Sequence, residues 1–249
     1  MTKDEPKTST IDPDEVERFG AIAESWWDPN GPFRPLHVLN PTRLTYIRDT
    51  LLNHFGRDAS TKRPFEGLRI LDIGCGGGLL SEPLARLGAE VIGADATERN
   101  IHVAQFHAEK SGLQIDYRHT SAEALAEAGE KFDAVINMEV IEHVADVAAY
   151  LASCRALLKP DGVMLISTIN RTTKAYMVAI LGAEYVLGWL PKGTHTYEKF
   201  LKPSELNAAL ESAQFHLTEL KGLTYKPFRG AWYITDDLAI NYMGTALPR

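Results

Sequence analysis

The chain has few cysteines and no excess of basic residues. Cys75 and Cys154 are its two cysteines, which is too few for a framework of disulfide bonds. The 26 Lys and Arg residues are outnumbered by 33 Asp and Glu, and the formal net charge of −7 leaves no basic footprint for nucleic acid. The N-terminus lacks the charged-then-apolar pattern of a secretion signal. These absences predict a cytoplasmic protein that binds small molecules or lipids and no nucleic acid.

The sequence also lacks an apolar run long enough to cross a membrane. Its most apolar stretch, residues 175–190, carries one charge in sixteen residues but falls short of the roughly 20 apolar residues that a span requires. Arg171, Lys174 and Lys192 flank it, a pattern typical of a segment that dips into a membrane surface or covers an apolar substrate. A buried helix or a contact between subunits is the alternative. Residues 171–200 are therefore predicted to form a lid, with peripheral attachment to the inner face of the membrane.

The rest of the chain predicts one α/β domain. With 249 residues and 45% hydrophobic content, it can bury one sizeable core. We expect residues 1–11 to be a disordered lead-in and residues 12–249 to form the domain. Within the domain, residues 12–66 are expected to form a helical cover, which includes a helix over 41–55. From Gly67 onward, strand-like and helix-like runs alternate, which predicts a parallel sheet. The predicted strands are 69–73, 90–94, 115–118, 132–137, 163–167, 214–220 and 231–234.

A glycine-rich turn follows the first predicted strand. Residues 74–78 read Gly-Cys-Gly-Gly-Gly, and glycines let the backbone turn sharply and approach a ligand without Cβ clashes. Asp95 closes the next apolar run, where a carboxylate at the carboxyl end of a strand can accept hydrogen bonds from both ribose hydroxyls. This arrangement predicts a site for a nucleoside cofactor.

Two residues distinguish S-adenosylmethionine from a dinucleotide as the candidate cofactor. A dinucleotide-binding fingerprint requires glycine or alanine at position 79, where this chain has Leu79. Asp72 places a carboxylate beside the turn, where it would repel a pyrophosphate but favour the ammonium and sulfonium groups of S-adenosylmethionine. S-adenosylmethionine is therefore the predicted cofactor. A nicotinamide cofactor and a purely structural turn are the alternatives.

A second group of polar residues follows the strand predicted over 132–137. Met138 comes first and is expected to line the adenosyl pocket, with an ordinary core methionine as the alternative. Glu139, Glu142 and His143 come next, and helical spacing would put all three side chains on one face. They predict either a site for a divalent cation such as Mg²⁺, which would favour a phenolate, or a metal-free general base at His143. The alternative is that the two carboxylates only stabilise a helix N-terminus.

Two isolated side chains complete the candidate site. Arg43 lies ahead of the first strand, and its guanidinium could pair bidentately with the methionyl carboxylate of the cofactor. An ordinary surface arginine is the alternative. His195 follows the apolar run and could face the substrate, although an isolated loop histidine is more often structural.

Motifs along most of the chain resemble those of the ubiquinone biosynthesis O-methyltransferase family, within the class I S-adenosylmethionine-dependent methyltransferases. The motifs occupy residues 26–28, 40–43, 72–78, 139–144 and 193–204. The resemblance runs from about Phe19 to the C-terminus. It implies a Rossmann-like fold in which a seven-stranded, mostly parallel sheet carries helices on both faces and ends in an antiparallel strand.

The resemblance also implies an activity, the O-methylation of polyprenyl catechol or phenol intermediates at both O-methylation steps of ubiquinone biosynthesis. Membership of a quinone-synthesis complex is a further expectation. A C-methyltransferase of the same pathway, another lipid-phenol methyltransferase and a non-catalytic scaffold of the complex are the alternatives. Activation of the phenol is expected from Glu139, Glu142 and His143, with His195 as a further candidate. The expected cofactor contacts are Arg43, Asp72, Gly74, Gly76, Asp95, Ala96, Ser121, Ala122, Glu123 and Met138.

Overall fold

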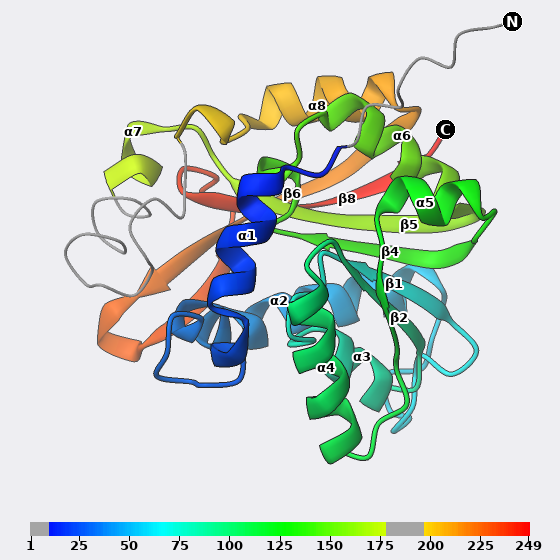
Figure 1. Ribbon diagram of the computed structural model, residues 1–249. Helices are drawn as coiled ribbons and strands as arrows, with labels where there is room; N and C mark the ends of the chain where they lie inside the picture. The colour runs from blue at the N-terminus through cyan, green and yellow to red at the C-terminus, as the bar shows by residue number, and fades with distance from the viewer. Residues whose placement is uncertain (1–9, 178–196) are drawn as a thin grey trace, which may run out of the picture.

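The computed structural model describes residues 10–177 and 197–249, and within them the central feature is one eight-stranded sheet. Its strand order is β3-β2-β1-β4-β5-β8-β6-β7 (Figure 1). The first five strands pair in parallel, whereas β8 pairs antiparallel with both β5 and β6. The strands are β1 (Arg69–Ile73), β2 (Glu90–Asp95), β3 (Asp116–His119), β4 (Phe132–Met138), β5 (Leu158–Ile169), β6 (Phe215–Lys226), β7 (Ala231–Thr235) and β8 (Asn241–Pro248).

The parallel sheet that the sequence predicted is confirmed, but it has one more strand than the seven implied by the resemblance. The additional strand is β8, which the sequence analysis did not predict and which fits between β5 and β6. The central strands β1 and β4 are buried on both faces, with Leu71 and Val135 directly paired and fully inaccessible to solvent. Such double burial explains why these strands are nearly continuous apolar runs.

Helices cover both faces of the sheet (Figure 1). Cores form on the two sides because alternate strand residues point to opposite faces: Leu71 packs among residues of α5, α6 and α8, and Ile70 packs among residues of α2 and α3. The helices are α1 (Pro13–Ala21), α2 (Arg34–His54), α3 (Ser81–Arg86), α4 (Glu98–Lys110), α5 (Ala122–Glu127), α6 (Val147–Leu157), α7 (Thr173–Ala175) and α8 (Pro203–Ser212). The described residues also contain four short 3₁₀ helices: η1 (Ala23–Ser25), η2 (Ile141–His143), η4 (Tyr197–Lys199) and η5 (Pro227–Arg229).

Helix α2 begins earlier than predicted. The prediction started it at Pro41, because proline favours the first turn of a helix, whereas the helix starts at Arg34 and runs through Pro41. Leu39 and Asn40, just ahead of the proline, are buried, and the Asn40 side-chain amide donates to the Leu79 carbonyl (2.9 Å). Tertiary packing therefore outweighs the one backbone hydrogen bond that an internal proline removes.

Parts of the predicted lead-in and of the predicted lid lie outside the residues that the structure describes. Residues 1–9 of the expected lead-in lie outside them, but Thr10 is buried: its carbonyl accepts from the Ala145 amide (2.8 Å) and its hydroxyl donates to Glu123. Most of the predicted lid, residues 178–196, also lies outside. Within the described part of the chain, no helix combines the length and apolar character needed to cross a membrane.

Candidate active site

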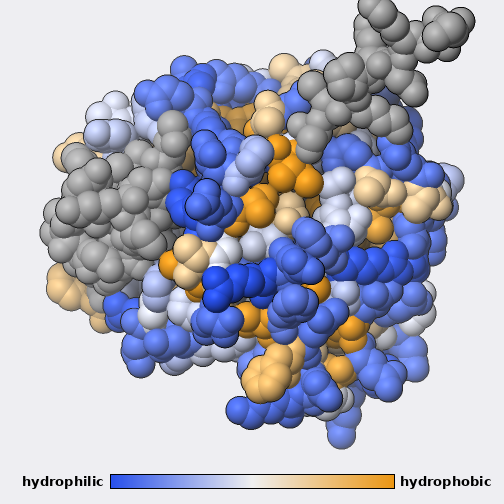
Figure 2. Space-filling model, viewed as in Figure 1, coloured by the Kyte–Doolittle hydropathy of each residue, from blue (hydrophilic) through white to orange (hydrophobic). Residues whose placement is uncertain are grey.

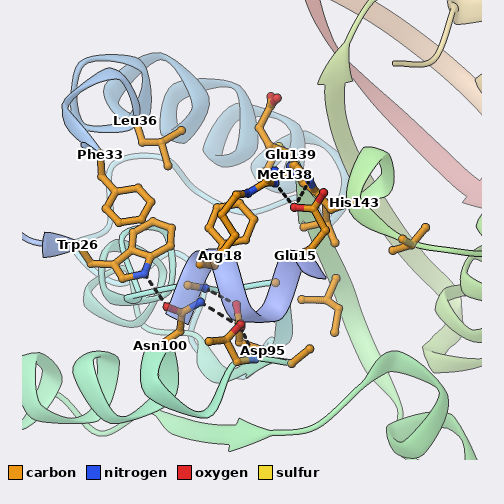
Figure 3. Close-up of a pocket in the computed structure, with 18 of the residues that line it drawn as sticks. Glu15, Arg18, Trp26, Phe33, Leu36, Asp95, Asn100, Met138, Glu139 and His143 are labelled. Carbon is orange, nitrogen blue, oxygen red and sulfur yellow. Dashed lines mark hydrogen bonds and ion pairs between the residues drawn. The ribbon is translucent and has the colours of Figure 1, made fainter. Parts of the chain in front are cut away.

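A cavity of about 990 Å³ lies at the carboxyl edge of the sheet. The ends of β1, β2 and β4 form its floor, and α1 and the start of α2 form its outer wall (Figure 3). The surface around this region is mostly hydrophilic, but apolar side chains gather in a hollow near the middle of the face shown in Figure 2. Ligands of open α/β sheets bind in this position, outside the carboxyl ends of the strands. The predicted helical cover, 12–66, supplies the outer wall.

The glycine turn requires its glycines for two separate reasons. Gly74 and Gly76 have φ angles of 70° and 53°, in the left-handed region that disfavours other residues. A Cβ atom on Gly74 would lie 2.5 Å from Val140 Cγ2, and one on Gly76 would lie 2.3 Å from the Trp26 ring. The turn is therefore held against the cavity wall with no room for a side chain.

Asp95 is held at the end of β2 by three donors. Its carboxylate accepts hydrogen bonds from the backbone amides of Gly76 (2.9 Å) and Thr97 (2.8 Å) and from the Asn100 side chain (3.1 Å). Burial raises the pKa of Asp95, although the Thr97 and Gly76 amides oppose the increase. The carboxylate borders the cavity, where the sequence predicted a ribose contact.

Trp26 packs directly against the glycine turn and forms part of the cavity wall. Its ring stacks on Phe33 with a centroid distance of 3.7 Å, and its Nε1 donates to Asn100 Oδ1 (2.8 Å, Figure 3). Asn100 therefore connects Trp26 to Asp95. The sequence analysis expected residues near Trp26 to cover the pocket but missed Asn100, because one asparagine inside a helical stretch carries no distinguishing pattern.

Arg43 and Glu139 form an ion pair at the cavity. Arg43 Nη2 lies 2.9 Å from Glu139 Oε1, and the Ser167 hydroxyl donates to the same oxygen (2.8 Å). Burial acts to raise the pKa of Glu139, but the Arg43 charge and the Ser167 hydrogen bond lower it overall, so the carboxylate is ionised. The Nε atom of Arg43 is buried and has no hydrogen-bond partner among the described residues. A ligand carboxylate in the cavity would supply that partner.

Glu142 points away from the cavity. It is 3% exposed, its Oε2 accepts from the Thr168 hydroxyl (2.9 Å), and it is absent from the cavity lining. Burial, followed by the negative charge of Glu139, raises its pKa well above the ordinary value. Glu142 therefore lies beneath the site, where burial and the charge of Glu139 both disfavour its ionised form.

His143 lies on the cavity wall against α1. Its Nδ1 atom is 3.3 Å from Glu15 Oε2 (Figure 3), and its ring meets the Phe19 ring edge to face, with the centroids 5.4 Å apart. Glu15 also contacts Lys199, whose Nζ lies 3.3 Å from Glu15 Oε1 and 2.8 Å from Asp12 Oδ2. The sequence analysis did not single out Glu15, which falls within the predicted helical cover over residues 12–66.

The predicted common face of Glu139, Glu142 and His143 does not form. The segment is no α-helix: Glu139 has a φ of 57°, and only Ile141–His143 form a single 3₁₀ turn. The described residues contain no group of three His, Cys, Asp or Glu side chains placed to hold a metal ion. Glu139 is already paired with Arg43, and Glu142 is turned away from the cavity toward Thr168, so this arrangement does not fit a divalent cation such as Mg²⁺.

Nine of the ten expected cofactor contacts line the one cavity. Asp72 is the exception: its carboxylate accepts from the Ser81 hydroxyl (2.5 Å) and lies beneath the glycine turn, and burial raises its pKa to about 7. His195 lies outside the described residues. The nine residues that line the cavity are Arg43, Gly74, Gly76, Asp95, Ala96, Ser121, Ala122, Glu123 and Met138.

Comparison with known proteins agrees with this arrangement. A family model described as a methyltransferase domain matches residues 44–220. The chain is 58% identical to the ubiquinone biosynthesis O-methyltransferase of Dinoroseobacter shibae, over 96% of this chain and 97% of that protein. It is 57% identical to the protein of the same name from Mesorhizobium japonicum, over 96% of each. The resemblance noted in the sequence is thereby confirmed.

Solved structures share the fold. The magnesium protoporphyrin IX methyltransferase of Synechocystis, with bound SAH, superposes with a TM-score of 0.61 at 21% identity, over 95% of this chain and 94% of that one. An S-adenosylmethionine-dependent methyltransferase of Clostridium acetobutylicum superposes with a TM-score of 0.63 at 13% identity, over 94% of this chain and 99% of that one. The predicted Rossmann-like class I methyltransferase fold is confirmed.

Proposed function

Because the chain belongs to the ubiquinone biosynthesis O-methyltransferase family, we propose that it transfers the methyl group of S-adenosylmethionine to a phenolic oxygen of polyprenyl catechol intermediates, at both O-methylation steps of ubiquinone biosynthesis. The observation that carries the proposal is the convergence of nine cofactor positions, from separate segments, on a cavity that also contains His143. The relatives match over nearly their whole length, so the substrate side is included in the likeness.

The cavity residues fit the two polar ends of this cofactor. The unpartnered Nε of Arg43 is suited to the methionyl carboxylate, and the Asp95 carboxylate to the ribose hydroxyls. Gly74 and Gly76 allow the backbone to approach the ligand. The backbone near Ala96 and the first turn of α5 border the end of the cavity beyond Asp95, which is suited to the adenine. When bound, the cofactor supplies an electrophilic sulfonium methyl group.

His143 is the proposed general base. A free phenol has a pKa near 10 and is mostly protonated at neutral pH, so a base that removes the proton promotes attack by oxygen. The O–C bond to the methyl group forms as the S–C bond breaks, and the phenolic proton passes to His143. Glu15, whose Oε2 lies 3.3 Å from Nδ1, holds the imidazole ring in place at the cavity wall. Arg43, Glu139 and the glycine turn contribute by positioning.

The apolar part of the cavity is suited to the prenyl tail. Ile169, Met177, Tyr225, Trp232 and Ile240 line the cavity. A substrate with a polyprenyl tail resides in a membrane, which agrees with the prediction that residues 175–190 contact the bilayer at its inner, cytoplasmic face. Beyond Met177 these residues lie outside the described part of the chain. Membership of a quinone-synthesis complex stays a prediction.

The direct test is methyl transfer from labelled S-adenosylmethionine to a short-chain prenyl catechol and to the corresponding demethylubiquinol, with mass spectrometry of the products. A methyl ether from both acceptors is the expected result. A product methylated on a ring carbon would instead assign the chain to the C-methyltransferases of the pathway. Binding of S-adenosylmethionine without transfer to either acceptor would favour a scaffold.

A further inference from the structure

The hairpin formed by β6 and β7 ends in an exposed aromatic residue between two cations. Phe228 is 105% exposed, and Lys226 and Arg229 are both exposed beside it. Gly230, with a φ of 60°, follows in the same turn. These three side chains, Lys226, Phe228 and Arg229, are called the hairpin tip below. One exposed apolar residue is ordinary in a protein surface, so its surroundings decide whether it has a use.

The exposed apolar residues of the described chain are concentrated on this side. Five large hydrophobic side chains are exposed among the described residues, and four of them, Tyr176, Met177, Phe228 and Ile234, belong to two neighbouring segments on this side. The two segments are α7 with the residues that follow it, and the β6–β7 hairpin. They are joined at their bases, because the Lys174 ammonium lies 2.9 Å from Asp237 Oδ2 just beyond β7. Both α7 and the hairpin lie on the left side of the molecule in Figure 1.

The hairpin also forms part of the cavity wall. Tyr225 and Trp232 pair across the two strands, with ring centroids 5.4 Å apart, and both line the cavity together with Met177. They are only three and four residues from Phe228 along the chain. A surface that holds the hairpin tip would therefore lie close to the apolar side of the cavity.

The hairpin tip is positively charged, whereas the whole chain has a negative net charge. The chain has a formal net charge of −7, yet neither Lys226 nor Arg229 has an acidic partner within 4.0 Å among the described residues. Lys226 Nζ lies instead over the Tyr233 ring, at 4.6 Å from its centroid. The acidic residues at the base of the hairpin are both paired with lysines, Asp236 with Lys221 and Asp237 with Lys174. The tip is thus locally cationic.

We propose that the hairpin tip is a membrane anchor, in which Phe228 inserts into the interface of an anionic phospholipid bilayer and Lys226 and Arg229 contact lipid phosphates. The anchor would place the apolar side of the cavity at the membrane, where a prenyl tail can enter. A single ring on a protruding turn suits insertion into lipid, whereas a stable protein interface requires roughly 800 Å² from each partner. The inference rests on the proposed function for its substrate, and it concerns a surface separate from residues 175–190.

The test is vesicle cosedimentation of the full-length protein. Vesicles of phosphatidylcholine alone are compared with vesicles that also contain phosphatidylglycerol. Phe228→Ala should weaken binding to the anionic vesicles by about ten-fold, because the variant loses the insertion of one aromatic side chain. The double variant K226Q/R229Q should remove the preference for anionic lipid. Phe106→Ala is the matched control, since Phe106 is another exposed aromatic residue, 69% exposed on α4, and should bind like the wild type.

Turnover of a water-soluble, short-chain catechol separates the anchor from the proposed function. All four proteins should methylate this acceptor equally, because the hairpin tip does not touch the proposed cofactor contacts. Absence of turnover in the wild type would contradict the proposed function and leave the vesicle comparison valid. Equal vesicle binding by F228A, F106A and the wild type would overturn the anchor. A change in oligomeric state on size-exclusion chromatography, with vesicle binding unchanged, would overturn it in favour of a contact between copies.

Discussion

The Nη2 atom of Arg43 lies 2.9 Å from Oε1 of Glu139, at the point where α2 meets the end of β4. The pair brings together a buried arginine and a carboxylate whose backbone has a φ of 57°, a conformation that costs a non-glycine residue free energy. A hydrogen bond from the Glu139 amide to the Ser167 carbonyl (3.1 Å) offsets part of this free-energy cost. Strained backbone that neighbouring contacts hold in place is typical of functional sites.

Replacement of Arg43 tests its role in holding the cofactor. Arg43→Met should raise the Kd for S-adenosylmethionine by roughly ten- to a hundred-fold, because it removes a charge-assisted hydrogen bond to the methionyl carboxylate. Arg43→Lys keeps the positive charge but loses the planar guanidinium, so its Kd for S-adenosylmethionine should lie between those of the wild type and Arg43→Met. Titration calorimetry measures the affinities, and thermal unfolding reports the cost of leaving Glu139 unpaired. Wild-type affinity in a folded Arg43→Met protein would exclude the contact.

Gly76 and Gly56 provide a matched pair of glycine substitutions. Their φ angles are 53° and 59°, so alanine incurs a similar backbone penalty of about 1 kcal/mol at either position. A Cβ on Gly76 also collides with Trp26 at 2.3 Å, whereas a Cβ on Gly56 meets nothing within 4 Å. Gly76→Ala should weaken S-adenosylmethionine binding at least about ten-fold, and the collision with Trp26 should make it lower folding stability more than Gly56→Ala does. Gly56→Ala should leave cofactor binding unchanged. Equal cofactor affinity in the two variants would refute the close approach at Gly76.

His143→Gln tests the general base. We expect kcat to fall by about 100-fold or more, which is the contribution typical of proton transfer by a positioned side chain, while the affinity for S-adenosylmethionine stays the same. His216→Gln is the control, because His216 is exposed on β6 and distant from the cavity lining. Retained kcat in His143→Gln, with loss in His195→Gln, would move the base to His195.

Asp72 makes folding stability depend on pH. Burial raises its pKa to about 7 in the folded protein, from 3.8 when unfolded. Between these values the folded state binds a proton that the unfolded state has lost, so this residue lowers stability as pH rises from about 4 to 7. Asp72→Asn keeps an acceptor for Ser81 and removes the titration. Its unfolding free energy relative to the wild type should rise by up to about 4 kcal/mol over this window.

Urea unfolding of the two proteins, without cofactor, at pH 4 and pH 8 measures the effect of Asp72. The comparison uses the difference between the two proteins, so that the titration of other groups cancels. A difference that stays constant between the two pH values would show that Asp72 is ionised in the folded protein.

Local sequence pattern was sufficient for the cofactor half of the site. The apolar run of β1, the glycines after it and Asp95 at the end of β2 each lie within a few residues of a strand end. Because parallel strands bring their carboxyl ends to one edge of a sheet, these short patterns also predicted that the residues meet. Gly74, Gly76 and Asp95 do lie together at the cavity.

The substrate half depended on contacts that no local pattern encodes. Helical spacing was assumed for Glu139, Glu142 and His143, but Ser167 on β5 and Arg43 on α2 hold Glu139 in a left-handed conformation that ends the regular spacing. Glu142 is thereby directed beneath the site to Thr168.

The sequence by itself determined the alternating α/β order, the glycine turn and the place of Asp95 at the end of a strand beside the cofactor cavity, because hydrophobic periodicity and turn chemistry act over a few neighbouring residues. Only the tertiary structure decided that Asp72 faces Ser81 rather than the cavity, that α2 continues through Pro41, and that Glu15 meets His143. These outcomes depend on burial and pairing between segments far apart in the chain, whose free energies outweigh local preference.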